Sequence, residues 1–468
     1  MLPKENEIML KKEEKKYLTW GNKLGYGCGE LGIDLASGLI SSFVLLYCTD
    51  AIGMNAAIVG TLIMVAKIVD AFSDIIFGHI LDRAPRRKMG KARPYVLWGY
   101  LGVAVSVVFL FSIPTRWGDV AQYTYFFIWY ILMSSVFYTI TYIAYSSLTT
   151  LITKNSNERL QTSVIRTIFM TLVITITAYF SVNLSAKFGG GAVGWQRVAL
   201  LYVVIGLVIN TISVFSVREM PEDLLSEEEE KQKEQREKVN LKETFQILFG
   251  NKYYVMLLLW NICNAIIGLM GGGIGAYYFT YVFNKPSLLG VMSLAGTVPM
   301  LLGLPLAPLF MKKFGTMRKM NMVFFAASII PRLIMLYAGM TVNVPLLVVM
   351  AVVAGFVGAP AGATMTPFTA IIADYIRVHN KKDITGSVYS CTSLGTKIGQ
   401  GIGSALPGWL LAVGGYINGA AVQPTSAIIV MQIMYVGMPI VSSVIMLIIS
   451  NFLKIEDEMP KTATESVE

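Results

Sequence analysis

Lys67, Asp70 and Asp74 place charges inside an apolar stretch that runs from about residue 56 to residue 81. This stretch is long enough to cross a bilayer as a helix, and spacings of three and four residues put the charges on one face. Each charge at membrane depth costs about 2.5–3.5 kcal/mol, so the group needs partners and a polar cavity. One interpretation is a structural ion pair between Lys67 and Asp70, which leaves Asp74 unexplained. We favour a coupling-ion site, because paired carboxylates supply hard oxygen ligands for Na⁺ and can also bind H⁺.

A second polar stripe precedes this charged stripe in the chain. Tyr26, Glu30 and Asp34 follow one another at four-residue spacing in the first apolar segment. Glu30 lies near one end of the segment, where we expect a solvated or salt-bridged group. Asp34 lies deeper, and a carboxylate can accept hydrogen bonds from two neighbouring hydroxyls at once, as sugar recognition requires.

Two further segments carry polar side chains at membrane depth. Tyr138, Tyr142 and Tyr145 lie at four- and three-residue spacing and form a stripe able to stack on a sugar ring; the alternative is that such hydroxyls join helices. Lys397 lies among glycines near the middle of another apolar segment, so it needs a carboxylate partner, for which Asp70 and Asp74 are the candidates. We expect Arg166 to lie at the start of its helix and to reach either the membrane–water interface or the cavity.

The composition excludes a soluble globular protein. Of 468 residues, 54% are hydrophobic and 14% are charged, and the mean hydropathy is +0.60. The chain has only 2 histidines, and its 4 cysteines follow no zinc or disulfide spacing. No nucleophile–base arrangement or phosphate loop is evident. We therefore expect neither an enzyme nor a cofactor other than the coupling cation.

The apolar segments predict an all-α membrane protein with about twelve transmembrane helices. Their approximate bounds are 24–49, 56–81, 95–114, 122–152, 164–186, 198–217, 252–283, 288–311, 321–340, 344–373, 388–413 and 425–452.

The loop charges predict the orientation of these helices. The loop of residues 82–93 is rich in Arg and Lys, whereas the loop of residues 49–57 contains neither. By the positive-inside rule, both termini face the cytoplasm of a multi-pass protein in the inner (plasma) membrane. The same bias explains the net charge of +9 without invoking nucleic acid. The N-terminus shows no cleavable signal peptide.

The pattern also predicts two halves. We expect a cytoplasmic N-terminal segment (1–20), a six-helix bundle (21–217), a middle loop (218–250), a second six-helix bundle (251–453) and a polar, disordered tail (454–468). Ser226 and Glu229 form a capping box, which predicts a short solvated helix in the middle loop; a linker is favoured over a regulatory site. Basic loops follow the second and eighth segments alike. This pattern is typical of major-facilitator transporters, whose substrate binds at mid-membrane between the halves.

Several motifs indicate a family. Residues 26–34, 47–50, 59–62, 67–74 and 90–94 resemble, in register, the glycoside–pentoside–hexuronide:cation symporters, and the resemblance covers nearly the whole chain. It implies that Asp70 and Asp74 bind the cation, with Lys397 beside them, and that Asp34 binds sugar. It extends more loosely to Thr139, Ser393 and Arg166. The candidate cation residues are thus Asp70, Asp74, Thr139 and Lys397, and the candidate sugar residues are Asp34, Tyr26, Lys67, Tyr142, Arg166 and Ser393.

The chain departs from the family pattern at some positions. Tyr142 stands where the melibiose permease has a second sugar-binding aspartate, and Ser146 stands near its tryptophan position. This suggests a sugar other than melibiose. Ile75 replaces the proline that often follows the second cation aspartate. Because both aspartates remain, we expect coupling, with Na⁺, Li⁺ and H⁺ all open.

The expected function is therefore cation-coupled symport of a glycoside, pentoside or hexuronide into the cell by alternating access. We expect the basic turn of residues 82–93 to form salt bridges that close the cytoplasmic side, and the monomer to be the working unit by analogy. The main alternative is a proton-coupled exporter of drugs or other small molecules on the same fold. A non-transporting sugar sensor and a uniporter are the others.

Overall fold

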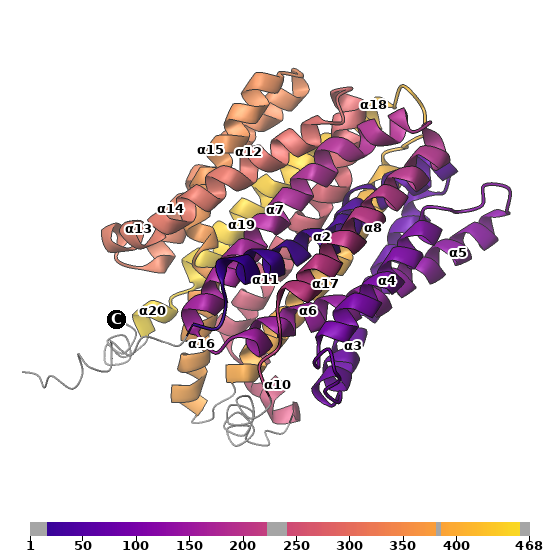
Figure 1. Ribbon diagram of the computed structural model, residues 1–468. Helices are drawn as coiled ribbons and strands as arrows, with labels where there is room; N and C mark the ends of the chain where they lie inside the picture. The colour runs from indigo at the N-terminus through magenta and orange to yellow at the C-terminus, as the bar shows by residue number, and fades with distance from the viewer. Residues whose placement is uncertain (1–15, 222–240, 381–384, 459–468) are drawn as a thin grey trace, which may run out of the picture.

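The computed structural model describes residues 16–221, 241–380 and 385–458. Long helices lie side by side, and α20 lies at the same end as α10 and α16 (Figure 1). Within the described residues, 11 helices are long and apolar enough to cross a membrane. A further predicted segment is α17 (Thr385–Val413), whose many Gly, Ser and Thr residues lower its hydropathy. The predicted all-α membrane fold with about twelve spanning helices is confirmed.

We call residues 20–216 the first half and residues 252–452 the second half. The first half contains α2 (Trp20–Leu46), η1 (Tyr47–Ile52), α3 (Ala56–Asp82), α4 (Arg93–Leu110), α5 (Asp119–Ile131), η2 (Leu132–Tyr138), α6 (Thr139–Ile152), α7 (Ser156–Lys187) and α8 (Gly191–Ser216).

The second half follows α10 (Leu241–Gly250), a helix within the predicted middle loop. It contains α11 (Lys252–Tyr277), η3 (Tyr278–Val282), α12 (Leu288–Gly303), η4 (Leu304–Leu306), α13 (Ala307–Phe314), α14 (Met317–Met340), α15 (Val344–Gly362), α16 (Met365–Asn380), α17, α18 (Thr425–Gln432), η5 (Ile433–Gly437) and α19 (Met438–Phe452). The predicted capping box at Ser226 and Glu229 lies outside the described residues.

Polar caps start several helices before their apolar stretches begin. The Asn155 side chain accepts a hydrogen bond from the Glu158 backbone at 3.1 Å, so α7 starts at Ser156 rather than near residue 164. Arg166 therefore lies inside α7, and the prediction that it opens this helix is wrong. The apolar pattern misses such polar first turns, because they hold no hydrophobic residue.

Proline and glycine divide segments that the apolar pattern joins. The predicted helix of residues 344–373 is two helices, since α15 ends at Gly362 just after Pro360 and α16 begins at Met365. The predicted helix of residues 288–311 contains the 3₁₀ turn η4, which includes Pro305. Proline lacks the backbone N–H that an α-helix interior needs.

Each half has a carboxylate cap at the start of its third spanning helix. Glu219, which follows α8, accepts hydrogen bonds from the backbone N–H groups of Ala92 and Arg93 at 2.9 and 3.1 Å, at the start of α4. Glu456, which follows α19, accepts the N–H groups of Met317 and Arg318 at 2.9 Å each, at the start of α14. A carboxylate there satisfies free amide groups and complements the helix dipole. The last spanning helix of each half thus fixes the start of its third.

Two further sequence expectations, on the C-terminal tail and on the basic turn, concern residues at these caps. Glu456 belongs to the short helix α20 (Ile455–Glu458), so the tail is ordered up to residue 458 and the prediction of disorder from residue 454 is wrong there. In the basic turn, Arg86 lies 3.9 Å from Glu219, which is a contact inside the first half. The expected salt bridges from this turn to the second half stay a prediction.

The halves meet closely at the end opposite the basic turn, which we call the outer end. Here α3 packs against α17 through small residues. A Cβ atom added at Gly408 would clash with the Ala56 carbonyl oxygen, and one at Gly60 would lie 2.9 Å from the Ala405 carbonyl oxygen. The Trp409 indole N–H donates to the Thr61 hydroxyl at 2.9 Å. This approach depends on the absence of side chains at both glycines.

Hydrogen bonds around Asp50 also join the halves at the outer end. The hydroxyls of Tyr281 and Tyr416, both from the second half, donate to the Asp50 carboxylate in η1. The neighbouring Thr49 hydroxyl lies 2.8 Å from the Tyr277 hydroxyl. A half-buried carboxylate is thus held by hydroxyls from the opposite half, and the outer end is closed.

We expect Gly408→Val to force α3 and α17 apart at the outer end, because the added side chain meets the Ala56 backbone. A cysteine introduced at Ser404 should then react faster with a membrane-impermeant maleimide in sealed vesicles. Gly358→Val is the matched control, since no atom lies within 4 Å of a Cβ at Gly358. Equal labelling of both variants would contradict the proposed role of this close contact.

Candidate functional site

A cavity of about 350 Å³ lies at mid-helix between the two halves. Its walls come from α2, α3, α5, η2 and α6 of the first half and from α11 and α17 of the second. A cavity of this size suits a small polar molecule. It contains all three charges of the α3 stripe together with Lys397, so the charges predicted to need a polar cavity do lie in one.

Thr139 joins the two carboxylates of α3. Its hydroxyl oxygen lies 3.0 Å from Asp70 Oδ1 and 3.0 Å from Asp74 Oδ1. The same oxygen lies 3.3 Å from the Ser134 carbonyl oxygen, where the π-helical turn η2 meets α6. A hydroxyl has only one proton to donate, so at most one of these oxygens receives it. The result is an oxygen-rich point that a proton or a hard cation would stabilise.

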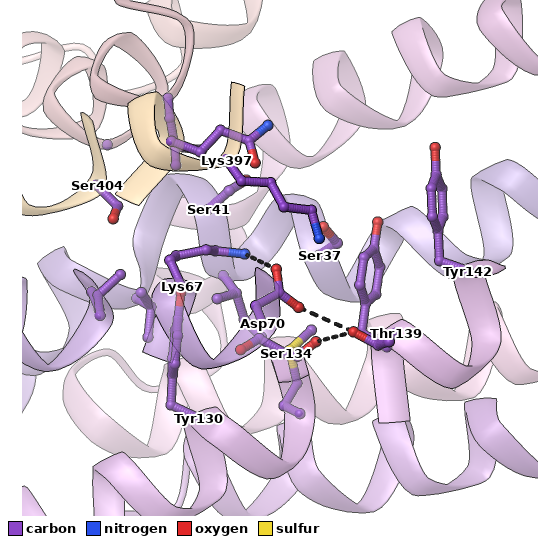
Figure 2. A pocket seen from close by; sticks show the side chains of 18 of the residues that line it. Ser37, Ser41, Lys67, Asp70, Tyr130, Ser134, Thr139, Tyr142, Lys397 and Ser404 are labelled. Atoms are coloured by element: carbon purple, nitrogen blue, oxygen red, sulfur yellow. Dashed lines mark hydrogen bonds and ion pairs between the residues drawn. The ribbon is translucent and has the colours of Figure 1, made fainter. Parts of the chain in front are cut away.

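Each carboxylate also faces a lysine. Lys67 Nζ lies 3.6 Å from Asp70 Oδ2 on the same helix. Lys397, from α17 of the second half, forms an ion pair with Asp74 Oδ2. Figure 2 shows both lysine side chains entering the cavity, with the Asp70 carboxylate between Lys67 and Thr139. The structural pair Lys67–Asp70 and the predicted partner of Lys397 are therefore both present.

The Lys397–Asp74 pair links the halves next to the oxygen cluster. Its side chains are 23% and 33% exposed, and both line the cavity. An ion that reaches these oxygens must therefore compete with an ammonium group for Asp74. This arrangement can exchange one cation for another at the point where the halves touch.

Asp34 lies behind the cavity wall. It is buried, and the Tyr138 hydroxyl donates to its Oδ1 at 3.0 Å. Tyr138 and Tyr142 line the cavity, with ring centroids 5.6 Å apart and ring planes at 10°. The two rings form a continuous aromatic wall, and Tyr138 connects this wall to Asp34.

Arg166 lies outside the cavity. Its Nε donates to Glu30 at 2.7 Å, and its guanidinium lies 4.6 Å from the ring centroid of Tyr145. Tyr145 and Tyr26 each donate to the other's backbone carbonyl at 2.7 Å. These residues form a buried group within the first half, and none of them is among the cavity-lining residues. Glu30 is thus salt-bridged, one of its two expected roles.

Ser393 is exposed and does not line the cavity, although Lys397 one turn later does. The sequence interpretation also missed polar residues that line it: Ser37, Ser41, Tyr130, Ser134, Gln400 and Ser404. Helical spacing offered a signal, because Ser37 and Ser41 continue the Asp34 stripe, and Gln400 and Ser404 continue the Lys397 stripe.

We expect Lys397→Met to lower the free energy of unfolding by about 1–3 kcal/mol, because it leaves the Asp74 carboxylate without its partner. Thermal unfolding in detergent measures this change. Adding Asp74→Asn to this variant should restore most of the lost free energy of unfolding.

The control is Arg377→Met, which breaks the exposed Arg377–Asp374 pair and should cost at most about 1 kcal/mol. Equal losses of stability in Lys397→Met and Arg377→Met would contradict a coupling of the halves by the Lys397–Asp74 pair. So would a Lys397→Met/Asp74→Asn double variant whose loss of stability equals the sum of the losses in its two single variants.

Comparison with known proteins gives a consistent result. The family model described as "MFS/sugar transport protein" matches residues 25–457. The isoprimeverose transporter of Lactiplantibacillus pentosus is 30% identical over 456 residues, covering 96% of this chain and 91% of that protein. The inner membrane symporter YicJ of Escherichia coli (strain K12) is 25% identical over 447 residues, covering 93% and 92%.

Solved structures share the fold. A D-xylose–proton symporter aligns with a TM-score of 0.63 at 14% identity, covering 92% of this chain and 97% of that chain. The spanning helices, the central cavity and the family match agree with one another. The chain belongs to the MFS/sugar transport protein family, as its resemblance to the glycoside–pentoside–hexuronide:cation symporters predicted.

Proposed function

We propose that this transporter couples the entry of a cation to the uptake of a sugar glycoside into the cell. The observation that carries the proposal is the charged cluster of the cavity, where Thr139 joins Asp70 and Asp74 while Lys397 reaches Asp74 from the other half. A cation site and a contact between the halves coincide there. Alternating access requires such a coincidence, since ion binding must alter how the halves meet.

The coupling step follows from charge balance. A cation or proton that binds at Asp70 and Asp74 neutralises the carboxylate that holds Lys397, so the ammonium is released from Asp74. The contact between the halves is then remade with the sugar in the cavity. Sugar and cation stabilise the same state, with a coupling free energy of about 1–3 kcal/mol.

Several finer features belong to this proposal. Na⁺, Li⁺ and H⁺ are all compatible with carboxylate, hydroxyl and carbonyl oxygens. The charge bias of the loops supports cytoplasmic termini, and uptake by a monomer fits a cavity that lies between the two halves of one chain. The 30% identity with an isoprimeverose transporter makes a disaccharide of that kind the first substrate to test.

We expect wild-type vesicles to accumulate isoprimeverose when an inward gradient of Na⁺, Li⁺ or H⁺ is imposed. Asp74→Asn should abolish accumulation, because the amide cannot neutralise a cation. Uptake of labelled isoprimeverose, melibiose and a methyl glucuronide under each gradient makes the measurement.

Asp374→Asn is the matched control, since this carboxylate is 41% exposed and pairs with Arg377 outside the cavity. No accumulation under any gradient, or undiminished accumulation in Asp74→Asn, would contradict the coupling site. Efflux of other compounds that is driven by an inward proton gradient and needs no sugar would instead support the exporter alternative.

A further inference from the structure

Most charged groups around the cavity already form ion pairs or hydrogen bonds with one another. Lys67 faces Asp70, Lys397 pairs with Asp74, and the Thr139 hydroxyl lies between the two carboxylates. The Tyr138 hydroxyl donates to Asp34. A sugar that binds by these groups has to break an existing contact first. Groups without such a contact are better candidates for direct recognition.

Gln400 is such a group. It lies one turn beyond Lys397 on α17, lines the cavity and is half-buried. Its side-chain amide makes no hydrogen bond to any residue in the described part of the chain. A primary amide has two donors and an acceptor, which matches neighbouring sugar hydroxyls that each donate and accept. A polar group left open in a partly buried wall loses stability unless a ligand or water satisfies it.

Serine hydroxyls extend this wall from both halves. Ser404 lies one turn beyond Gln400 on α17 and donates to the Gly401 carbonyl at 2.7 Å. Ser37 and Ser41 are one turn apart on α2, and Ser41 donates to the Gly38 carbonyl at 3.3 Å. Figure 2 shows Ser37, Ser41 and Ser404 around the cavity that holds Lys67 and Asp70. Because the protons of Ser41 and Ser404 point to their own helices, their oxygens can accept from sugar hydroxyls.

Both α2 and α17 run toward the outer end, so Ser404 lies beyond Lys397 on α17. Gly401, which follows Gln400, lies close to Lys67 of α3. These groups therefore line the cavity beside the charged cluster and toward the outer end. They are also uncharged, whereas each lysine of the cavity already faces a carboxylate. An anionic sugar would find carboxylates close by and only paired ammonium groups.

We propose that Gln400 and Ser404 of α17, opposite Ser37 and Ser41 of α2, form a sugar-hydroxyl subsite that selects an uncharged glycoside. This inference rests on the proposed function. Gln400 is its main specificity determinant. A glycoside held between these walls contacts both halves, so it can replace the Lys397–Asp74 contact that the cation loosens. Sugar binding and closure of the cavity are then one event.

The test is transport of isoprimeverose and its monodeoxy analogues by wild type and Gln400→Leu. The leucine keeps the approximate volume and removes the amide, so KM for the parent sugar should rise about five- to tenfold. Wild type should discriminate against the analogue that lacks the hydroxyl bound by Gln400, and Gln400→Leu should lose that discrimination alone. Cation binding without sugar should stay unchanged, which shows that the variant is folded.

Ser404→Ala and Ser163→Ala complete the design. Ser404→Ala should raise KM by a smaller factor, whereas Ser163→Ala, at an exposed position on α7 outside the cavity, should behave as wild type. An unchanged KM in Gln400→Leu, or an equal loss of discrimination at every hydroxyl, overturns the subsite. Higher affinity of wild type for a methyl glucuronide than for isoprimeverose overturns the uncharged substrate class.

The outcomes also separate this inference from the proposed function. If wild type concentrates isoprimeverose in a manner that needs Asp74 while Gln400→Leu is unaffected, only the subsite is wrong. If wild type concentrates no sugar under any gradient, both proposals fail together.

Discussion

The cost of charge at membrane depth is the constraint on which the rest of this structure depends. Two carboxylates on α3 would each be expensive in a low-dielectric interior, and the structure balances them with two lysines. One lysine comes from the same helix. The other, Lys397, comes from the opposite half, so the electrostatic balance of the site depends on how the halves are arranged. An ion that changes this balance therefore acts on the arrangement itself.

The backbone supports this arrangement by allowing the halves to approach at the outer end. Gly60 and Gly408 let α3 and α17 touch through their backbones, and Asp50 is held by tyrosine hydroxyls from the second half. These contacts are small or polar rather than large and apolar, so they can separate without exposing a hydrophobic surface to water. The carboxylate caps at Glu219 and Glu456 fix helices within each half instead. Rigid halves joined by separable contacts are what rocking motion requires.

Much of the fold and the charged residues of the cavity could be predicted from the sequence. Spanning length and apolarity indicated the helices. Charges at helical spacing indicated Asp70 and Asp74, and a lone lysine at membrane depth indicated Lys397, because burial of charge leaves few alternatives. The uncharged residues that line the cavity, and those that do not reach it, were harder to predict. Arg166 and Glu30 neutralise each other across two helices, and no local pattern distinguishes such a pair from a ligand-binding arginine. Gln400 was missed for the converse reason, since an uncharged side chain in a glycine-rich helix gives no strong signal until the cavity is seen.

Calorimetric binding of isoprimeverose to the purified protein, with and without each saturating cation, tests the central claim most directly. The account predicts that one of Na⁺, Li⁺ or H⁺ tightens sugar binding about 5–150-fold and that sugar tightens the binding of that cation by the same factor. Both effects should vanish in Asp74→Asn. Equal sugar affinity with and without all three cations would contradict the account, because the charged cluster at Asp74 would then not connect the cation to the sugar.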